Sequence, residues 1–91
     1  MGHDGTLQFG HYRDKDKVEV DVVISRGAEV WGVEVKASTA VDRGDIQGLL
    51  RLADKAGDGF QTGIVLYAGD AVLPLDGPRI QAVPMRKLWE L

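Results

Sequence analysis

The chain has 91 residues, a formal net charge of −3 and no cysteine, with 44% hydrophobic and 27% charged residues. These values are typical of one small globular domain, and they exclude a disulfide framework and a thiolate metal site. No apolar run reaches about 18 residues and no signal-peptide pattern is present, so we expect a cytoplasmic protein that does not enter a membrane. We expect residues 1–6 to form a polar lead and residues 7–91 to form a single domain.

The first part of the chain predicts three strands. Residues 7–13 form the first strand, and the charged residues 14–17 form a turn. Residues 18–26 alternate between apolar and polar positions, which places one set of side chains on each face of a strand. Val18, Val20, Val22 and Ile24 share one face, and Glu19 and Asp21 share the other.

A hairpin joins the second and third predicted strands. Gly27 and Ala28 suit a type II′ turn, because that turn needs glycine at its first central position. The return strand spans residues 29–37, with Glu34 and Lys36 on the face opposite Trp31. We expect Trp31 and Trp89 to be core anchors because of their size.

The second part of the chain predicts a helix and two further strands. Asp42 is a suitable N-cap and Asp45 occupies the third helical position of a capping box, so a helix should span residues 43 to about 57 and end at Gly57 and Gly59. Residues 63–68 form a continuous apolar strand, followed by a turn at 69–70, a strand at 79–83 and a helical turn after Pro84. The predicted fold is α/β, a mixed sheet with an antiparallel hairpin, one crossover helix and a parallel strand.

The two-residue turn predicts which residues of the hairpin lie opposite each other. If Gly27 and Ala28 form the loop, Asp21 lies opposite Glu34 and Glu19 lies opposite Lys36. Cross-strand Cβ atoms are about 4.5–5.5 Å apart, so Asp21 and Glu34 repel each other unless a cation lies between them. Two carboxylates, water and substrate phosphate oxygens are typical ligands of Mg²⁺.

This arrangement has a purely structural alternative. A Glu19–Lys36 ion pair with a solvated Asp21 explains the same residues without any metal, and an aspartate followed later by Glu-x-Lys is a loose pattern. The lysines of the turn at 14–17 can touch phosphates, but their alternation with Asp14 and Asp16 favours a solvated turn.

Three segments together suggest a family. EVDVVI (residues 19–24), VEVKAS (33–38) and GIVLYAGD (63–70) resemble the C-terminal domain of bacterial and archaeal AAA-type ATPases, known as domain of unknown function 4143. That domain is similar to the PD-(D/E)xK superfamily of restriction-endonuclease-like folds. The resemblance extends from about His11 to Trp89, and it implies a restriction-endonuclease-like core that lacks the N-terminal helix of many members.

The resemblance also implies roles for individual residues. Asp21 takes the place of the motif aspartate, and Glu34 and Lys36 take the places of the (D/E)xK pair; Asp21 and Glu34 would then hold Mg²⁺ or Mn²⁺. Glu19 and Gln47 are weaker candidates, and Val20 stands where the namesake motif has proline. The implied partners are DNA or RNA and an ATPase module in the same longer chain.

Two functional hypotheses follow. The first is a nuclease-like domain that hydrolyses phosphodiesters with Mg²⁺. The second is an interaction or regulatory module that keeps the fold without the chemistry, which the acidic net charge and the missing N-terminal helix favour.

Overall fold

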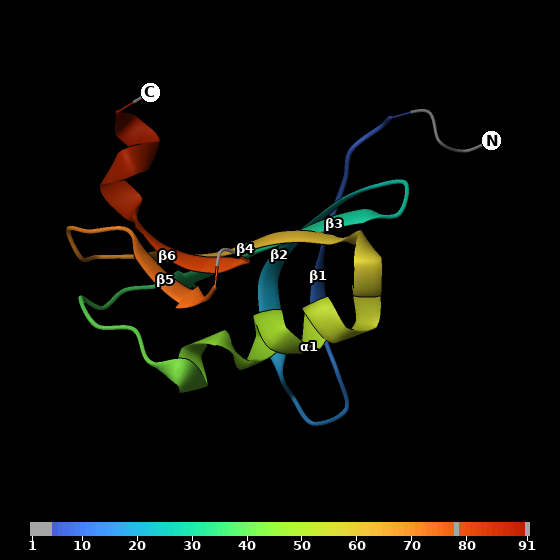
Figure 1. Cartoon of the computed structure of the whole chain (residues 1–91), viewed down its shortest axis with the longest axis horizontal. Coiled ribbons are helices and arrows are strands. Elements are labelled where there is room, and N and C mark those ends of the chain that lie inside the picture. The colour runs from blue at the N-terminus through green and yellow to red at the C-terminus, as the bar shows by residue number, and fades with distance from the viewer. Residues whose placement is uncertain (1–4, 78, 91) are drawn as a thin grey trace.

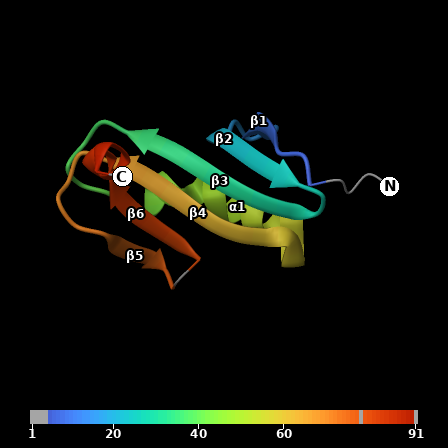
Figure 2. The same ribbon diagram turned by 90° about the horizontal axis from the view of Figure 1, so that it is seen from above.

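Six strands form one mixed sheet. The computed structural model describes residues 5–77 and 79–90, apart from the side chain of Trp89, so most of the predicted polar lead lies outside the described residues. The strands are β1 (Gln8–Arg13), β2 (Glu19–Arg26), β3 (Glu29–Lys36), β4 (Phe60–Tyr67), β5 (Leu73–Asp76) and β6 (Ile80–Pro84), in the order β1-β2-β3-β4-β6-β5. Strand β4 is parallel to β3 and β6, and the other neighbours are antiparallel (Figure 2). The predicted mixed α/β sheet is confirmed.

One helical segment connects β3 to β4. It begins with the 3₁₀ turn η1 (Arg43–Ile46), continues as α1 (Gln47–Ala56) and ends in the 3₁₀ turn η2 (Gly57–Gly59). Asp42 is the N-cap and Asp45 completes the capping box, as predicted. A last 3₁₀ helix, η3 (Met85–Trp89), follows Pro84. No helix in the described part of the chain is long and apolar enough to span a membrane.

Helix α1 covers one face of the sheet and forms the core with it (Figure 1). Ile46, Leu49 and Leu52 of the helical segment are buried. They pack with buried side chains of three strands, β2, β4 and β6: Val20, Phe60, Val65, Tyr67, Ile80 and Ala82. Two glycines permit close contact: a Cβ at Gly32 would lie 2.6 Å from Leu49 Cδ2, and a Cβ at Gly48 would lie 2.0 Å from the carbonyl oxygen of Glu19. The packing of α1 against β2 therefore requires a residue without a side chain at position 48.

No described α-helix lies over the opposite face of the sheet (Figures 1 and 2). Trp31 belongs to this face, because it pairs with Ile24 of β2 while the neighbouring Gly32 faces α1. Trp31 is half-buried, and the guanidinium of Arg26 lies 5.7 Å from the centre of its ring. The prediction of Trp31 as a core anchor is therefore wrong, and the side chain of Trp89 lies outside the described residues.

A β-bulge interrupts the regular alternation of β2. Tyr12 pairs with Val20 and Gly10 pairs with Val23, so two residues of β2, Asp21 and Val22, oppose one residue of β1. A bulge of this kind shifts the faces of the strand by one residue. Val20 is consequently buried against α1 while Val22 pairs with Val33 on the uncovered face, which corrects the prediction that Val20 and Val22 share a face.

The predicted hairpin is correct, whereas one edge strand was not predicted. Arg26 pairs with Glu29, and Gly27 has a φ of 60° while Ala28 does not have a positive φ, as a type II′ turn requires. Strand β4 begins at Phe60, before the predicted start at residue 63. The unpredicted strand is β5, a four-residue edge strand that contains Pro74, which is a position where proline is tolerated.

Candidate functional site

Two carboxylates meet where β2 and β3 stop pairing through their backbones. The Cα register runs from Arg26–Glu29 to Val22–Val33. Beyond it, Glu34 Oε1 accepts the backbone N–H of Asp21 at 2.9 Å, and Asp21 Oδ2 accepts the backbone N–H of Val35 at 2.9 Å. Each acidic side chain thus accepts a hydrogen bond from a backbone N–H of the other strand, which a backbone carbonyl would accept in a regular sheet. The predicted juxtaposition of Asp21 and Glu34 is present, and it is held by these two reciprocal hydrogen bonds.

The environment of Glu34 opposes its negative charge. Burial raises the pKa of Glu34 from 4.5 to about 6, and the carboxylates of Asp21 and Glu19 act in the same direction. The N–H of Asp21, which Glu34 accepts, acts in the opposite direction but does not cancel the rise. Near neutral pH, Glu34 is therefore an ionised carboxylate with excess negative charge around it.

Lys36 does not neutralise this charge. Its ammonium Nζ lies 2.5 Å from Oδ2 of Asp45, and that oxygen also accepts the backbone N–H of Asp42 at 2.8 Å. The hydrogen bond from Lys36 lowers the pKa of Asp45, and the N–H of Asp42 adds to this effect. The predicted Glu19–Lys36 ion pair is therefore replaced by a Lys36–Asp45 pair between β3 and the start of the helical segment.

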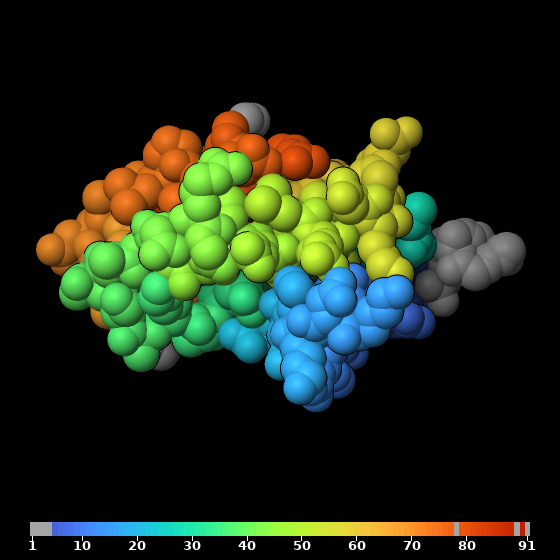
Figure 3. Space-filling model, turned by 90° about the horizontal axis from the view of Figure 1, so that it is seen from below, coloured from blue at the N-terminus to red at the C-terminus, as the bar shows by residue number. Residues whose placement is uncertain are grey.

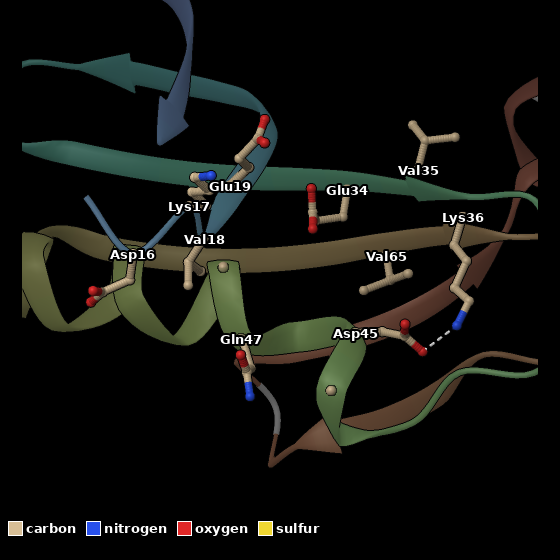
Figure 4. Close-up of a pocket in the computed structure, with 12 residues that line it drawn as sticks. Asp16, Lys17, Val18, Glu19, Glu34, Val35, Lys36, Asp45, Gln47 and Val65 are labelled. Atoms are coloured by element: carbon tan, nitrogen blue, oxygen red, sulfur yellow. Dashed lines mark hydrogen bonds and ion pairs between the residues drawn. The ribbon is translucent and has the colours of Figure 1, made fainter. Parts of the chain in front are cut away.

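An open cavity of about 550 Å³ lies between the sheet and the start of the helical segment. Glu34 is at its centre, and Lys36 and Asp45 are at one end (Figure 4). Asp16 and Lys17 of the β1–β2 turn are at the other end. The buried Val65 of β4 contributes an apolar part of the wall.

Two of the predicted residues fit a divalent cation. The bridge uses Oδ2 of Asp21 and Oε1 of Glu34, so the second oxygen of each carboxylate is the one that a ligand would meet. The excess negative charge at Glu34 favours a cation there, and hard oxygen donors suit Mg²⁺. Among residues 5–77 and 79–90, no group of three or more acidic or histidine side chains converges as a complete metal site. Any Mg²⁺ held here would therefore keep water or substrate oxygens as its other ligands.

The structure places the predicted site residues unequally. Glu19, Glu34, Lys36 and Gln47 line the cavity, whereas Asp21 is exposed just outside its wall beside Glu34. Asp45 was predicted only as a capping residue, yet it is the partner of Lys36. Its position in a capping box was the available signal, because such a residue fixes a charge at a helix start.

Comparison with known proteins gives one match. No curated protein and no protein of solved structure matches the chain significantly. A family model described as a domain of unknown function, DUF4143, matches residues 2–88, which is most of the 91-residue chain. The chain belongs to the DUF4143 family.

Proposed function

We propose that this domain is a nuclease-like member of the PD-(D/E)xK superfamily that hydrolyses phosphodiesters with Mg²⁺ or Mn²⁺. The observation that carries the proposal is the reciprocal bridge between Asp21 and Glu34, which holds two carboxylates together near the start of β2 and the end of β3. Repelling carboxylates are destabilising on adjacent strands unless a cation joins them.

The order of the elements supports the same proposal. An antiparallel hairpin carries the aspartate on β2 and the Glu-x-Lys pair on β3, and a helical crossover then leads to the parallel strand β4. This is the arrangement that a restriction-endonuclease-like fold would require. The resemblance of residues 19–24, 33–38 and 63–70 to the C-terminal domains of AAA-type ATPases supports an ATPase module in the same longer protein.

Each site residue would have a separate task. Asp21 and Glu34 would hold the metal ion, which supplies a polarised phosphoryl oxygen and a bound water of lowered pKa. Lys36 would donate hydrogen bonds to the phosphate and stabilise the negative charge that develops on it. Asp45 keeps the Lys36 ammonium at the cavity wall, so the lysine is already placed before a substrate arrives.

The test compares metal binding and cleavage in the same set of proteins. Single-stranded and double-stranded DNA and RNA are incubated with Mg²⁺ or Mn²⁺ and the wild type, Asp21→Asn, Glu34→Gln or Lys36→Ala. Mn²⁺ broadening of amide NMR signals follows the metal site without any substrate. Glu29→Gln is the matched control, because Glu29 is on the same strand as Glu34 but pairs with Arg26 instead.

The expected results separate the roles. Asp21→Asn and Glu34→Gln should lose both the selective broadening around residues 21 and 33–35 and the cleavage. Lys36→Ala should keep the broadening and lose the cleavage, and Glu29→Gln should keep both. Metal-dependent cleavage that survives Lys36→Ala would refute the role given to Lys36.

A second function is favoured by a different observation. The Lys36 ammonium already has a carboxylate partner at 2.5 Å, and no group of three or more acidic or histidine side chains converges among the described residues. These features suit an interaction module that retains the fold without catalysis. In that case, Mn²⁺ would broaden no signals selectively, and no nucleic acid would be cleaved.

A further inference from the structure

We infer that Lys17 is a phosphate-binding residue of the same cavity, so that the substrate is an oligonucleotide extending past the carboxylates. This inference rests on the proposed function and adds to it a residue that contacts a phosphate next to the one at the carboxylates. It concerns the turn between β1 and β2, which the sequence suggested to be merely solvated.

Hydrogen bonds between Asp14 and the other residues of the β1–β2 turn hold the turn in one conformation. Asp14 Oδ1 accepts the backbone N–H groups of Asp16 and Val18 at 2.9 and 3.1 Å. The backbone of Asp14 also accepts the N–H of Lys17 at 2.9 Å and donates to the carbonyl of Val18 at 3.0 Å. Every residue from 14 to 18 except Lys15 is therefore joined to another by a hydrogen bond.

Helix α1 holds the turn in place. Arg51 Nη1 of α1 lies 2.6 Å from Asp14 Oδ2 and 3.2 Å from Asp16 Oδ2. Figure 3 shows the light-blue turn packed directly against the yellow-green helix. The turn therefore has a fixed position relative to the cavity that begins beside it.

Lys17 occupies a backbone position that favours glycine. Its φ is 64°, and it is the one non-glycine residue with a positive φ among those described. Hairpin loops of this kind place a left-handed residue, usually glycine, after a tight turn. A lysine in that conformation costs conformational energy, and such cost is concentrated at functional sites.

The side chain of Lys17 is available for a ligand. Lys17 is exposed, and its ammonium forms no ion pair or hydrogen bond with any residue that the structure describes. Asp16 and Glu19 line the same cavity, but neither pairs with it. Arg51 and Lys36, in contrast, are already bound to carboxylates.

The cavity therefore has a lysine and an aspartate at each end and Glu34 between them (Figure 4). A single phosphate group at Glu34 would contact only one of these two lysines. A chain of phosphates, with one group at the carboxylates and a neighbouring group at Lys17, would use both ends. Phosphate contacts of this kind position a nucleic acid without reading its sequence.

Equilibrium binding tests the inference without cleavage. A fluorescent single-stranded DNA oligonucleotide is titrated with wild type, Lys17→Ala and Lys15→Ala in the presence of Ca²⁺, over a series of salt concentrations. Lys15 is the matched control, since it is an exposed lysine of the same turn that lines a neighbouring cavity instead. Lys17→Gly is a second variant that removes the same side chain and suits the positive φ.

The inference predicts a loss specific to residue 17. Lys17→Ala and Lys17→Gly should weaken binding about 5- to 10-fold and lower the salt-dependence slope by about 0.7, the value for one phosphate contact on a single strand. Lys15→Ala should leave the slope unchanged. Lys17→Gly should unfold at the same temperature as the wild type or a few degrees higher, which excludes misfolding as the cause of weaker binding.

The opposite results would overturn the inference. Equal losses in Lys15→Ala and Lys17→Ala would show nonspecific attraction to the turn. An absence of oligonucleotide binding would also overturn the inference. If the same protein showed selective Mn²⁺ broadening near Glu34, the proposed metal site would still be supported. Binding that depends on Lys17 without any Mn²⁺ broadening would support the phosphate contact and contradict the proposed nuclease.

Discussion

Replacing Glu34 with glutamine tests the electrostatics of the site through protein stability. The pKa of Glu34 is raised to about 6 in the folded protein, so the folded state disfavours its ionised form. Below the ordinary value of 4.5 the carboxyl is protonated in both folded and unfolded chains, so the free-energy cost of the ionised form in the folded state is absent. The cost develops as the pH rises from about 4.5 through about 6 and is complete above that range. Glutamine removes the charge but can still accept the N–H of Asp21.

The size of the effect follows from the same pKa. The difference between 4.5 and about 6 corresponds to about 2 kcal/mol, at 1.36 kcal/mol for each tenfold change in proton affinity. Glu34 is only partly buried, and solvent screening reduces this to about 1 kcal/mol. Such a change in the free energy of unfolding moves the Tm of a domain of this size by about 4–8 °C.

The assay is urea and thermal unfolding of wild type and Glu34→Gln from pH 4 to pH 8 without divalent cations. We expect the variant to be more stable by about 1 kcal/mol at pH 7.5 and equally stable at pH 4. Glu29→Gln should show no such gain, because Glu29 loses its ion pair with Arg26. Carboxylates that titrate elsewhere affect both proteins equally and cancel in the comparison.

Two outcomes would refute this reasoning. One is a variant less stable than the wild type at pH 7.5, which would mean that the charge of Glu34 stabilises the fold. The other is a stability difference that does not change between pH 4 and pH 8, which would mean that the difference arises from packing.

Three further predictions concern the helix contact, the lysine and the cation. Gly48→Ala should destabilise the fold by about 1–3 kcal/mol or more, because its Cβ would meet a backbone oxygen at 2.0 Å. Gly10→Ala, whose Cβ meets nothing within 4 Å, should change stability by less than about 0.5 kcal/mol in the same urea titrations. Asp45→Asn should lose the ion pair with Lys36 and lower the Tm at neutral pH. Because the pKa of Asp45 is lowered from 3.8, this difference should disappear as the pH falls below about 3.8, and a constant difference would contradict the ion pair. Saturating Mn²⁺ should raise the Tm at pH 7.5 and lose this effect as the pH falls through about 6, where protons compete at Glu34; a shift retained at pH 5 would place the ion elsewhere.

The register of the hairpin was predictable from the sequence. A two-residue loop determines the pairing of both strands, so the proximity of Asp21 and Glu34 followed from a loop made of Gly27 and Ala28. The helix start at Asp42 was equally accessible, because a capping box is a local pattern. Both of these features depend on residues that are close together in the sequence, and both were predicted correctly.

Features that depend on contacts between distant elements were not predicted. The bulge in β2 arises from pairing with β1, and the apolar pattern of residues 18–24 is equally compatible with an uninterrupted strand. The Lys36–Asp45 pair forms only after the chain has turned from β3 into the helical segment. The clamp of Arg51 on Asp14 joins residues 37 positions apart, and no local pattern indicates it.

The bulge in β2 also determines how deletions in this strand would act. If Val22 were deleted, Val20 and Val23 would keep their places against α1, since regular alternation across the remaining residue puts both on that face. Asp21 would then pair with Val33 and lie on the uncovered face, and Glu34 would lie opposite Val20. A chain shorter by one residue would thus retain the core and all the acidic residues but lose the two-carboxylate arrangement. The deletion would thus separate the proposed two-carboxylate site from the core, because it removes the first and keeps the second.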